Sequence, residues 1–225
     1  MRKGEQKKQD ILTAAADLFA HKGYVSTSVQ DILDRLNCSK GSFYHHFNTK
    51  FEVLAEIAQA RAAAAYLNFK ENEPAGALAA LNELLYQASY LNPESLPLLK
   101  DLNALQSGFE GTALLYAMQE SVHKTFYHSF VAVMNSLRQT DEAVYTDEST
   151  LNIVFHSFLS GCSLLIAGSR VQAPNKESAD GLTLLRALRR HLEISLGMNP
   201  GSIVIISSDA LGNLLDSLQR ISADS

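Results

Sequence analysis

The chain has 225 residues, of which 46% are hydrophobic and 19% are charged, and its formal net charge is −5. The length allows one sizeable core, or a small domain joined to a larger one. No apolar run approaches the roughly 20 residues that a membrane span needs. No apolar stretch long enough for a secretion signal follows the charged N-terminus, so we expect a soluble, cytoplasmic protein.

Charge is distributed unevenly along the chain. Residues 1–50 carry eight Lys/Arg and five Asp/Glu, whereas residues 51–225 carry eleven and nineteen. A basic module on an acidic body suits a protein that touches phosphate with one end, although differences of this size between segments are common. The two cysteines, Cys38 and Cys162, lie far apart in apolar helical contexts and are expected to be reduced thiols.

The first predicted helix covers residues 7–21, and Gly23 stands just past its end, where a left-handed residue is common. A short helix over residues 28–35 follows, with Val29, Ile32 and Leu36 on one apolar face. Asn37 tolerates the left-handed backbone that a helix-ending turn needs.

Ser39 suits the N-cap of a very short helix over residues 40–45. The outer side of this helix offers small, polar and basic side chains, while Phe43 and Phe47 can anchor it inward. A short helix of this kind, propped on another through a tight turn, suits insertion into a DNA major groove.

Two blocks of sequence resemble the helix-turn-helix signature of TetR-family transcriptional regulators. They are Thr27-Ser28-Val29-x-x-Ile32, and Ser39 to Phe47 followed by Lys50. The stretch from Ile11 to Tyr24 is similar to that family's first helix and its exit. The resemblance covers about the first 55 residues without a gap. Asn37 stands where the family usually has Gly, and Cys38 where it usually has a small aliphatic residue.

By motif position, the resemblance implies a set of DNA-contacting residues. The candidates are Thr27, Ser39, Lys40, Gly41, Ser42, Tyr44, His45 and Lys50. Those from Ser39 to Ser42, with Tyr44, are expected to face the groove. Thr27, Tyr44, His45 and Lys50 are candidate phosphate contacts. Tyr44 and His46 could instead pack within the head.

Six longer helices are predicted in the body, over residues 50–70, 77–91, 94–107, 112–139, 147–170 and 177–196. Thr49 is placed to cap the first of them. Lys50 lies in its first turn, where a cation is slightly unfavourable unless a phosphate approaches. Gly161 and its small neighbours allow close helix contact. In the family, the last two of these helices pair with a partner's to form a dimer; alternatively, they are central helices of a monomer.

The tail after Gly197 is the least regular part. The β-branched run 202–206 could be a strand or a buried extended segment. Ser208 can cap a terminal helix over residues 209–220, which would cover the body or extend the dimer contact.

No enzyme motif is present in the sequence, and no metal or cofactor is expected. Histidines on the helix 112–139 and on its neighbour could bind a metal, but isolated helical histidines are more often satisfied or exposed. A small-molecule pocket is more plausible, because ligand sites between helices are mostly apolar with a few polar groups. The candidate residues, each of which also fits an ordinary core role, are Tyr86, Asn103, Met118, His123, Phe126, Tyr127, Phe158 and Cys162.

We therefore predict an all-α protein of two domains. Residues 1–48 form a three-helix, helix-turn-helix DNA-binding domain, and residues 49–225 form a helical domain for ligand binding and dimerisation. The resemblance implies a homodimeric repressor that binds a palindromic operator in double-stranded DNA and is released by a small-molecule inducer. A ligand-independent regulator controlled by a protein partner is the alternative, and a helical enzyme or carrier is a weaker one. An enclosed, partly apolar cavity would favour an inducer, and a filled core would not.

Overall fold

The computed structural model describes residues 3–105, 108–168 and 179–223, and in these ranges it is helical without strands. The head contains α1 (Lys3–Lys22), α2 (Val29–Leu36) and α3 (Lys40–Tyr44). The body contains α4 (Lys50–Glu71), α5 (Ala77–Ala88), the 3₁₀ turn η1 (Pro93–Ser95), α6 (Leu96–Ala104), α7 (Phe109–Gln139), α8 (Glu148–Gly168), α9 (Ala179–Ser195) and α10 (Ser208–Ala223). The predicted loop around residues 173–175 lies outside the described ranges.

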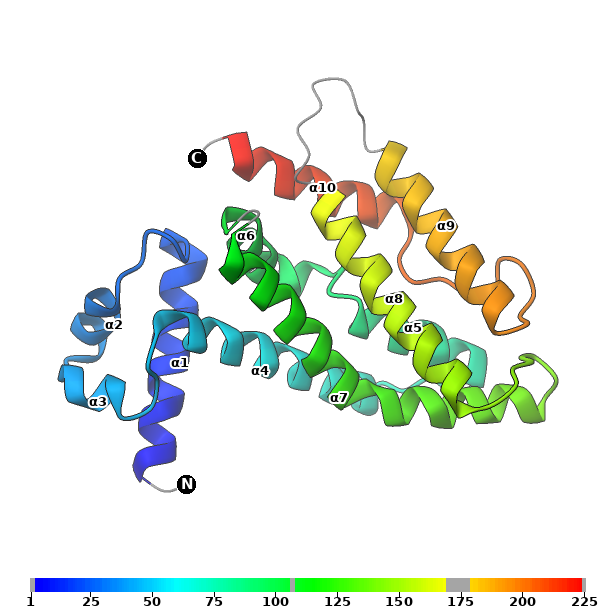
Figure 1. Cartoon of the computed structure of the whole chain (residues 1–225), viewed down its shortest axis with the longest axis horizontal. Coiled ribbons are helices and arrows are strands. Elements are labelled where there is room, and N and C mark those ends of the chain that lie inside the picture. The colour runs from blue at the N-terminus through cyan, green and yellow to red at the C-terminus, as the bar shows by residue number, and fades with distance from the viewer. Residues whose placement is uncertain (1–2, 106–107, 169–178, 224–225) are drawn as a thin grey trace.

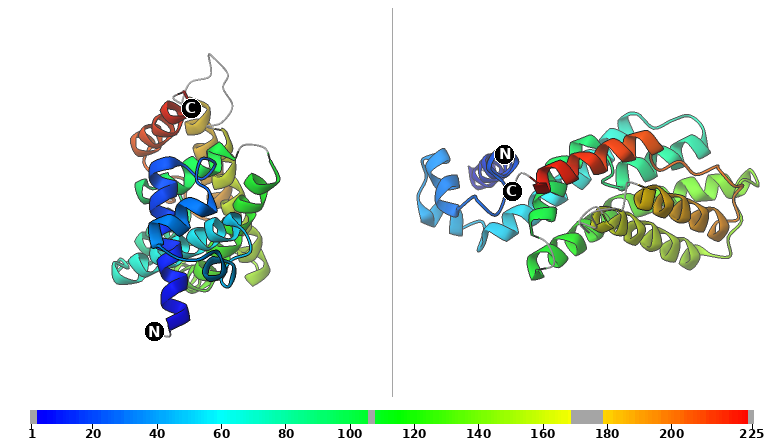
Figure 2. Two further views of the ribbon diagram at one scale, coloured as in Figure 1. Left: turned by 90° about the vertical axis from the view of Figure 1, so that its left-hand side faces the viewer. Right: turned by 90° about the horizontal axis from the view of Figure 1, so that it is seen from above.

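The molecule is elongated, with the three head helices at one end (Figures 1 and 2). Helix α4 leaves the head and runs along α7 into the body, so it belongs to both parts. Helices α8 and α9 pack against each other on one side of the body, and α10 lies across α6 and α9. Helix α1 of the head packs against α4 and α6 of the body.

The helix caps and left-handed turns of the head form as the chemistry of their residues predicts. Ser28 caps α2 by accepting from the Asp31 N–H at 3.1 Å, and Asp31 accepts from the Ser28 N–H at 2.6 Å. Asn37 ends α2 with φ +46°, and Gly23 ends α1 with φ +81°. Ser39 caps α3 and Thr49 caps α4. The predicted caps at Ser39 and Thr49 and the left-handed positions of the head are confirmed, whereas Ser28, predicted inside the helix 28–35, is the N-cap of α2.

For residues 202–206, the structure excludes a strand, one of the two predicted alternatives. This stretch is a segment without strand pairing, in which Ile203, Ile205 and Ile206 are buried and Val204 is exposed. Asn82 on α5 replaces a strand partner: its Nδ2 donates to Ser202 O at 3.1 Å, and its Oδ1 accepts from Val204 N at 2.9 Å. The side chain thereby satisfies two backbone groups that a sheet would otherwise pair.

The cap of the terminal helix lies one residue earlier than predicted. Ser208 is already helical, and Ser207 Oγ accepts from Ala210 N at 3.2 Å. The prediction that the helix covers the body is confirmed, because α10 packs on α6 and α9. Leu211, Leu214, Leu215 and Leu218 are its buried residues.

Helix α8 differs from the prediction that no apolar run approaches the length of a membrane span. Its stretch Glu148–Ile166 is long and apolar enough to cross a membrane by length and composition, although polar residues interrupt it. Half of that stretch is buried inside the protein. Gly161 explains part of this burial, because a Cβ at this position would lie 2.4 Å from the Leu188 side chain on α9.

We expect Asn82→Ala to lower the free energy of unfolding by about 1–2 kcal/mol, because two backbone groups of the tail lose their hydrogen-bond partner. Chemical denaturation measures this change. Asn213→Ala, on the exposed side of α10, is the matched control and should stay near wild type. Equal stability of the two variants would contradict the role given to Asn82.

Candidate nucleic-acid interface

The outer face of α3 presents most of the predicted DNA contacts to solvent. Ser39, Lys40, Gly41 and His45 are exposed, Ser42 is half-buried, and 53% of Tyr44 is accessible. Gly41 has open space around its Cα, where the nearest atom to an added Cβ is 3.9 Å away. The five-residue helix therefore offers a small, polar surface with one cation and one aromatic ring.

Two phenylalanines hold α3 in place from behind. Phe43 and Phe47 are fully buried, with ring centroids 5.9 Å apart, which confirms their assignment to the core. Ile32 and Leu33 of α2 are buried in the same core. Burial of two aromatic rings contributes several kcal/mol, enough to fix a helix that is too short to be stable alone.

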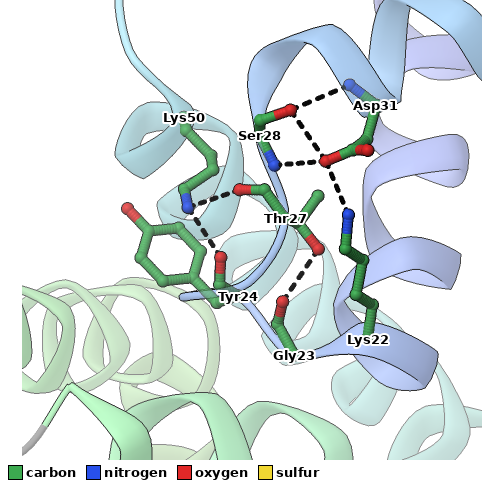
Figure 3. Close-up of polar contacts among 7 residues, drawn as sticks. All are labelled: Lys22, Gly23, Tyr24, Thr27, Ser28, Asp31 and Lys50. Atoms are coloured by element: carbon green, nitrogen blue, oxygen red, sulfur yellow. Dashed lines mark hydrogen bonds and ion pairs between the residues drawn. The ribbon is translucent and has the colours of Figure 1, made fainter.

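Lys50 and Thr27 do not join this exposed face. The Lys50 ammonium donates to Tyr24 O and Thr27 O, both at 2.6 Å, and lies 4.1 Å from the centre of the Tyr24 ring (Figure 3). Thr27 is buried, and its hydroxyl donates to Gly23 O at 2.8 Å. The predicted phosphate contacts by these two side chains are therefore not supported by their placement.

The position of Lys50 in the first turn of α4 has a structural explanation. Two carbonyl dipoles and an aromatic face stabilise its charge, which offsets the slightly unfavourable helix terminus. Burial lowers the pKa of Lys50, and the nearby carboxylates of Glu110, Asp101 and Asp31 oppose that shift. The hydrogen bonds of the Lys50 ammonium thus connect α4 to the segment that joins α1 to α2.

Tyr24 connects the same segment to two further helices of the body. Its backbone N–H donates to Asp101 Oδ1 on α6 at 2.9 Å, and its hydroxyl lies 3.4 Å from both carboxylate oxygens of Glu110 on α7. Burial raises the pKa of the Tyr24 hydroxyl, and the charge of Glu110 adds to the shift. One residue of the head therefore contacts three body helices, α4 through Lys50, α6 and α7.

Asp101 is a carboxylate in an apolar setting. It is 4% exposed, and burial raises its pKa to about 6, while the Tyr24 N–H and Lys50 pull the pKa back down. Sequence reasoning missed Asp101 and the contacts of Tyr24 with the body. The available signal was a single acidic residue in the otherwise leucine-rich helix Leu96–Ala104.

The predicted ligand residues do not form one site. Met118 and Cys162 line a narrow space between α7 and α8, whereas Phe126 packs on Tyr66 of α4. Other candidates lie elsewhere: Phe158 packs on Phe155, Tyr86 is on α5, and Asn103 is on α6.

His123 and Tyr127 belong to a stack of rings on α7 and α8. The His123 ring lies parallel to Tyr127 and to His156, with centroids at 4.7 Å and 4.4 Å. Burial, and then the neighbouring His156, lower the pKa of His123. In the described part of the chain, no group of three or more His, Cys, Asp or Glu side chains could hold a metal ion.

The space beside Met118 and Cys162 is almost closed. Ser89 and Tyr90 also line it, and its volume of about 10 Å³ holds at most one water molecule. Gln119 Nε2 donates to Ser163 Oγ at 2.7 Å across the gap between α7 and α8. Burial raises the pKa of the Cys162 thiol, so this cysteine is an unreactive core residue. Within the described residues of the body, the region around this space is therefore a filled core.

The sequence of the head matches known regulators. Residues 11–57 match the family described as bacterial regulatory proteins, tetR family. A transcriptional repressor of Rhodococcus jostii, KstR2, is 41% identical over 51 residues, which are 23% of this chain and 25% of that protein. An uncharacterised regulator of Lactococcus lactis is 49% identical over 50 residues, 22% of this chain and 26% of that protein. The chain thus matches about a quarter of the length of these curated relatives.

Solved structures resemble the whole chain in fold. Salmonella enterica GusR superposes with a TM-score of 0.56 at 21% identity, covering 88% of this chain and 98% of that one. Bacillus subtilis FadR, solved in complex with stearoyl-CoA, has a TM-score of 0.54 at 17% identity, covering 84% and 97%. At these identities the likeness concerns the fold of the head and of the helical body.

We expect Asp101→Asn to raise the free energy of unfolding by about 1–2 kcal/mol at pH 7.5. The raised pKa means that the folded chain binds the proton more tightly than the unfolded chain, so the wild type loses stability as pH rises from about 4 through about 6. Asparagine keeps the acceptor for Tyr24 N–H without the charge. Denaturation at pH 4.5 and pH 7.5 should show a clearly larger gain at the higher pH; a gain of equal size at both would contradict the assignment.

Proposed function

Since the chain belongs to the TetR family of bacterial regulatory proteins, we propose that it is a homodimeric repressor. In this proposal it acts in the cytoplasm, binds a palindromic operator, and is released by a small-molecule effector. The observation that carries the DNA-binding part is the exposed face of α3, fixed from behind by two buried phenylalanines. We place the domain boundary between residues 48 and 49, just before α4.

Direct contact with DNA falls to the residues of α3 and its cap. Lys40 is the one cation among them, suited to a guanine edge or a phosphate. Gly41 allows the backbone to approach closely, and Tyr44 and His45 can reach the adjacent phosphates. Lys50 and Thr27 act indirectly in this proposal, because they fix the segment that carries α2 and α3.

The dimer face is proposed on α8 and α9. Large apolar side chains stand in solvent on both helices: Ile153 and Leu164 on α8 are 67% and 59% exposed, and Ile194 on α9 is 64% exposed. Spacings of seven and four residues place Ile153, Ser160 and Leu164 on one side of α8. A second copy of the chain would bury this stripe and present two α3 helices to successive major grooves.

Control of DNA binding is proposed to act through the contacts of Tyr24. An effector that prefers another arrangement of α4 and α6 would move Lys50 and Asp101, and with them the head. The FadR structure with stearoyl-CoA supports an effector, because it shows that this fold can hold a ligand. The nearly closed space beside Met118 instead favours the second candidate, a regulator controlled by a protein partner.

Selection of binding sites from random duplexes, followed by affinity measurements at two salt concentrations, tests the proposal. We expect a palindromic consensus, one dimer per site, and an affinity that falls as salt rises. Weak binding that is equal on every duplex would overturn the DNA-binding part.

Lys40→Ala should weaken binding to the selected site and reduce the slope of log K against log salt by about 1, because one cation leaves the interface. Lys50→Met is the matched control. Its ammonium faces two carbonyls, so the variant should lose about 2 kcal/mol of stability while its salt slope stays at the wild-type value. Fluorescence anisotropy titrations measure both slopes. A reduced slope for Lys50→Met, with none for Lys40→Ala, would reverse the two roles.

Leu164→Arg should yield a folded monomer, because the side chain is 59% exposed and a charge in an apolar interface is costly. Leu67→Arg on α4, where the leucine is 60% exposed, is the matched control and should remain dimeric. Light scattering coupled to size-exclusion chromatography measures the mass of both variants. A dimeric Leu164→Arg protein would exclude this face of α8 from the interface.

A further inference from the structure

A polar cluster joins the middle of α4 to the turn that precedes α6. Asn92 is fully buried, and its Oδ1 accepts three hydrogen bonds: from Arg61 Nη2 at 2.7 Å, Ser95 N at 3.1 Å and Ser95 Oγ at 2.7 Å. Three donors on one oxygen fix the orientation of the amide, since a flipped Asn92 would turn its NH₂ toward all three.

Two donors in this cluster have no acceptor. Asn92 Nδ2 and Arg61 Nε are both buried and lack a hydrogen-bond partner among the described residues. Buried donors are normally satisfied, and leaving one unpaired is costly. The two side chains are hydrogen-bonded to each other, so both unpaired donors belong to one small patch.

The charge of Arg61 is incompletely balanced. Its closest carboxylate is Glu94, with Nη2 and Oε2 3.9 Å apart, and the Glu94 side chain is 71% exposed. Burial lowers the pKa of Arg61, with Glu94 opposing that shift. The Arg61 side chain retains 18% exposure, so part of it reaches the surface although Nε is buried.

We propose that Arg61 and Asn92 form a subsite for the oxyanion of a small molecule, a carboxylate or a phosphate. A guanidinium offers paired N–H donors that match the two oxygens of such a group, and the amide NH₂ supplies another donor. The incoming anion displaces the loosely held Glu94. This inference rests on the proposed effector control and gives the effector a chemical class.

The position of the subsite links it to DNA binding. Arg61 lies on α4, the helix whose first residue is Lys50, and Asn92 caps the η1 turn that leads into α6, the helix of Asp101. An anion between them changes how α4 and α6 lie relative to each other. These are two of the helices that hold Tyr24 in place.

Thermal unfolding and calorimetry with octanoate and hexyl phosphate test the proposal, with octanamide as the neutral probe, all at constant ionic strength. We expect one or both anions to stabilise the wild type more than octanamide, and the preferred anion distinguishes carboxylate from phosphate. Asn92→Asp keeps the Oδ1 acceptor but replaces the unpaired donor with a charge that pairs with Arg61. It should raise the melting temperature without ligand and weaken anion binding by about tenfold. Glu94→Gln removes the competitor and should tighten binding.

Asn213→Asp, on the exposed side of α10, is the control for an added carboxylate at a distant site, and it should bind both anions as the wild type does. Equal stabilisation by the anions and octanamide, or unchanged affinity in both Asn92→Asp and Glu94→Gln, would overturn the subsite. A crystal structure grown with the preferred anion that shows only water on Arg61 Nε and Asn92 Nδ2 would overturn it as well. Operator affinity measured without any probe tests the proposed repressor separately, so the two failures are distinguishable.

Discussion

The arrangement of the molecule depends on how the partly buried ammonium of Lys50 finds its hydrogen-bond acceptors. Lys50 lies where α4 leaves the head, and an amine removed from water there needs acceptors. The carbonyls of Tyr24 and Thr27 supply them, which fixes the segment between α1 and α2 against α4. Because the N–H of Tyr24 is bonded to Asp101, the same segment is also fixed to α6. The positions of α4 and α6 therefore determine the orientation of α2 and α3.

Sequence reasoning succeeded where the determining chemistry is local. The predicted caps at Ser39 and Thr49 and the left-handed Asn37 depend on neighbours a few residues away, so the sequence pattern predicts them. The role of Lys50 depends on carbonyls 23 and 26 residues away. No periodicity in the sequence predicts the direction in which a lysine side chain points.

The predicted ligand residues failed to converge for a related reason. Composition indicated a body rich in aromatic rings, but those rings pack on one another across α4, α7 and α8. The separate space beside Met118, between α7 and α8, measures only about 10 Å³. Tyr90 lines that space in a left-handed conformation, φ +57°, which is costly for a bulky residue. An effector that enters there must open the core, and its apparent affinity is reduced by the fraction of molecules already open.

The terminal helix has a consequence for the order of events during synthesis. Asn82 bonds to backbone groups 120 and 122 residues further along the chain, and α10 packs on α6. While the ribosome is still adding the last segment, α6 is made but uncovered, whereas the head has all its own residues. Closing contacts at such sequence separation is slow. The chain therefore acquires a helix-turn-helix before α10 covers α6, one of the helices that position it.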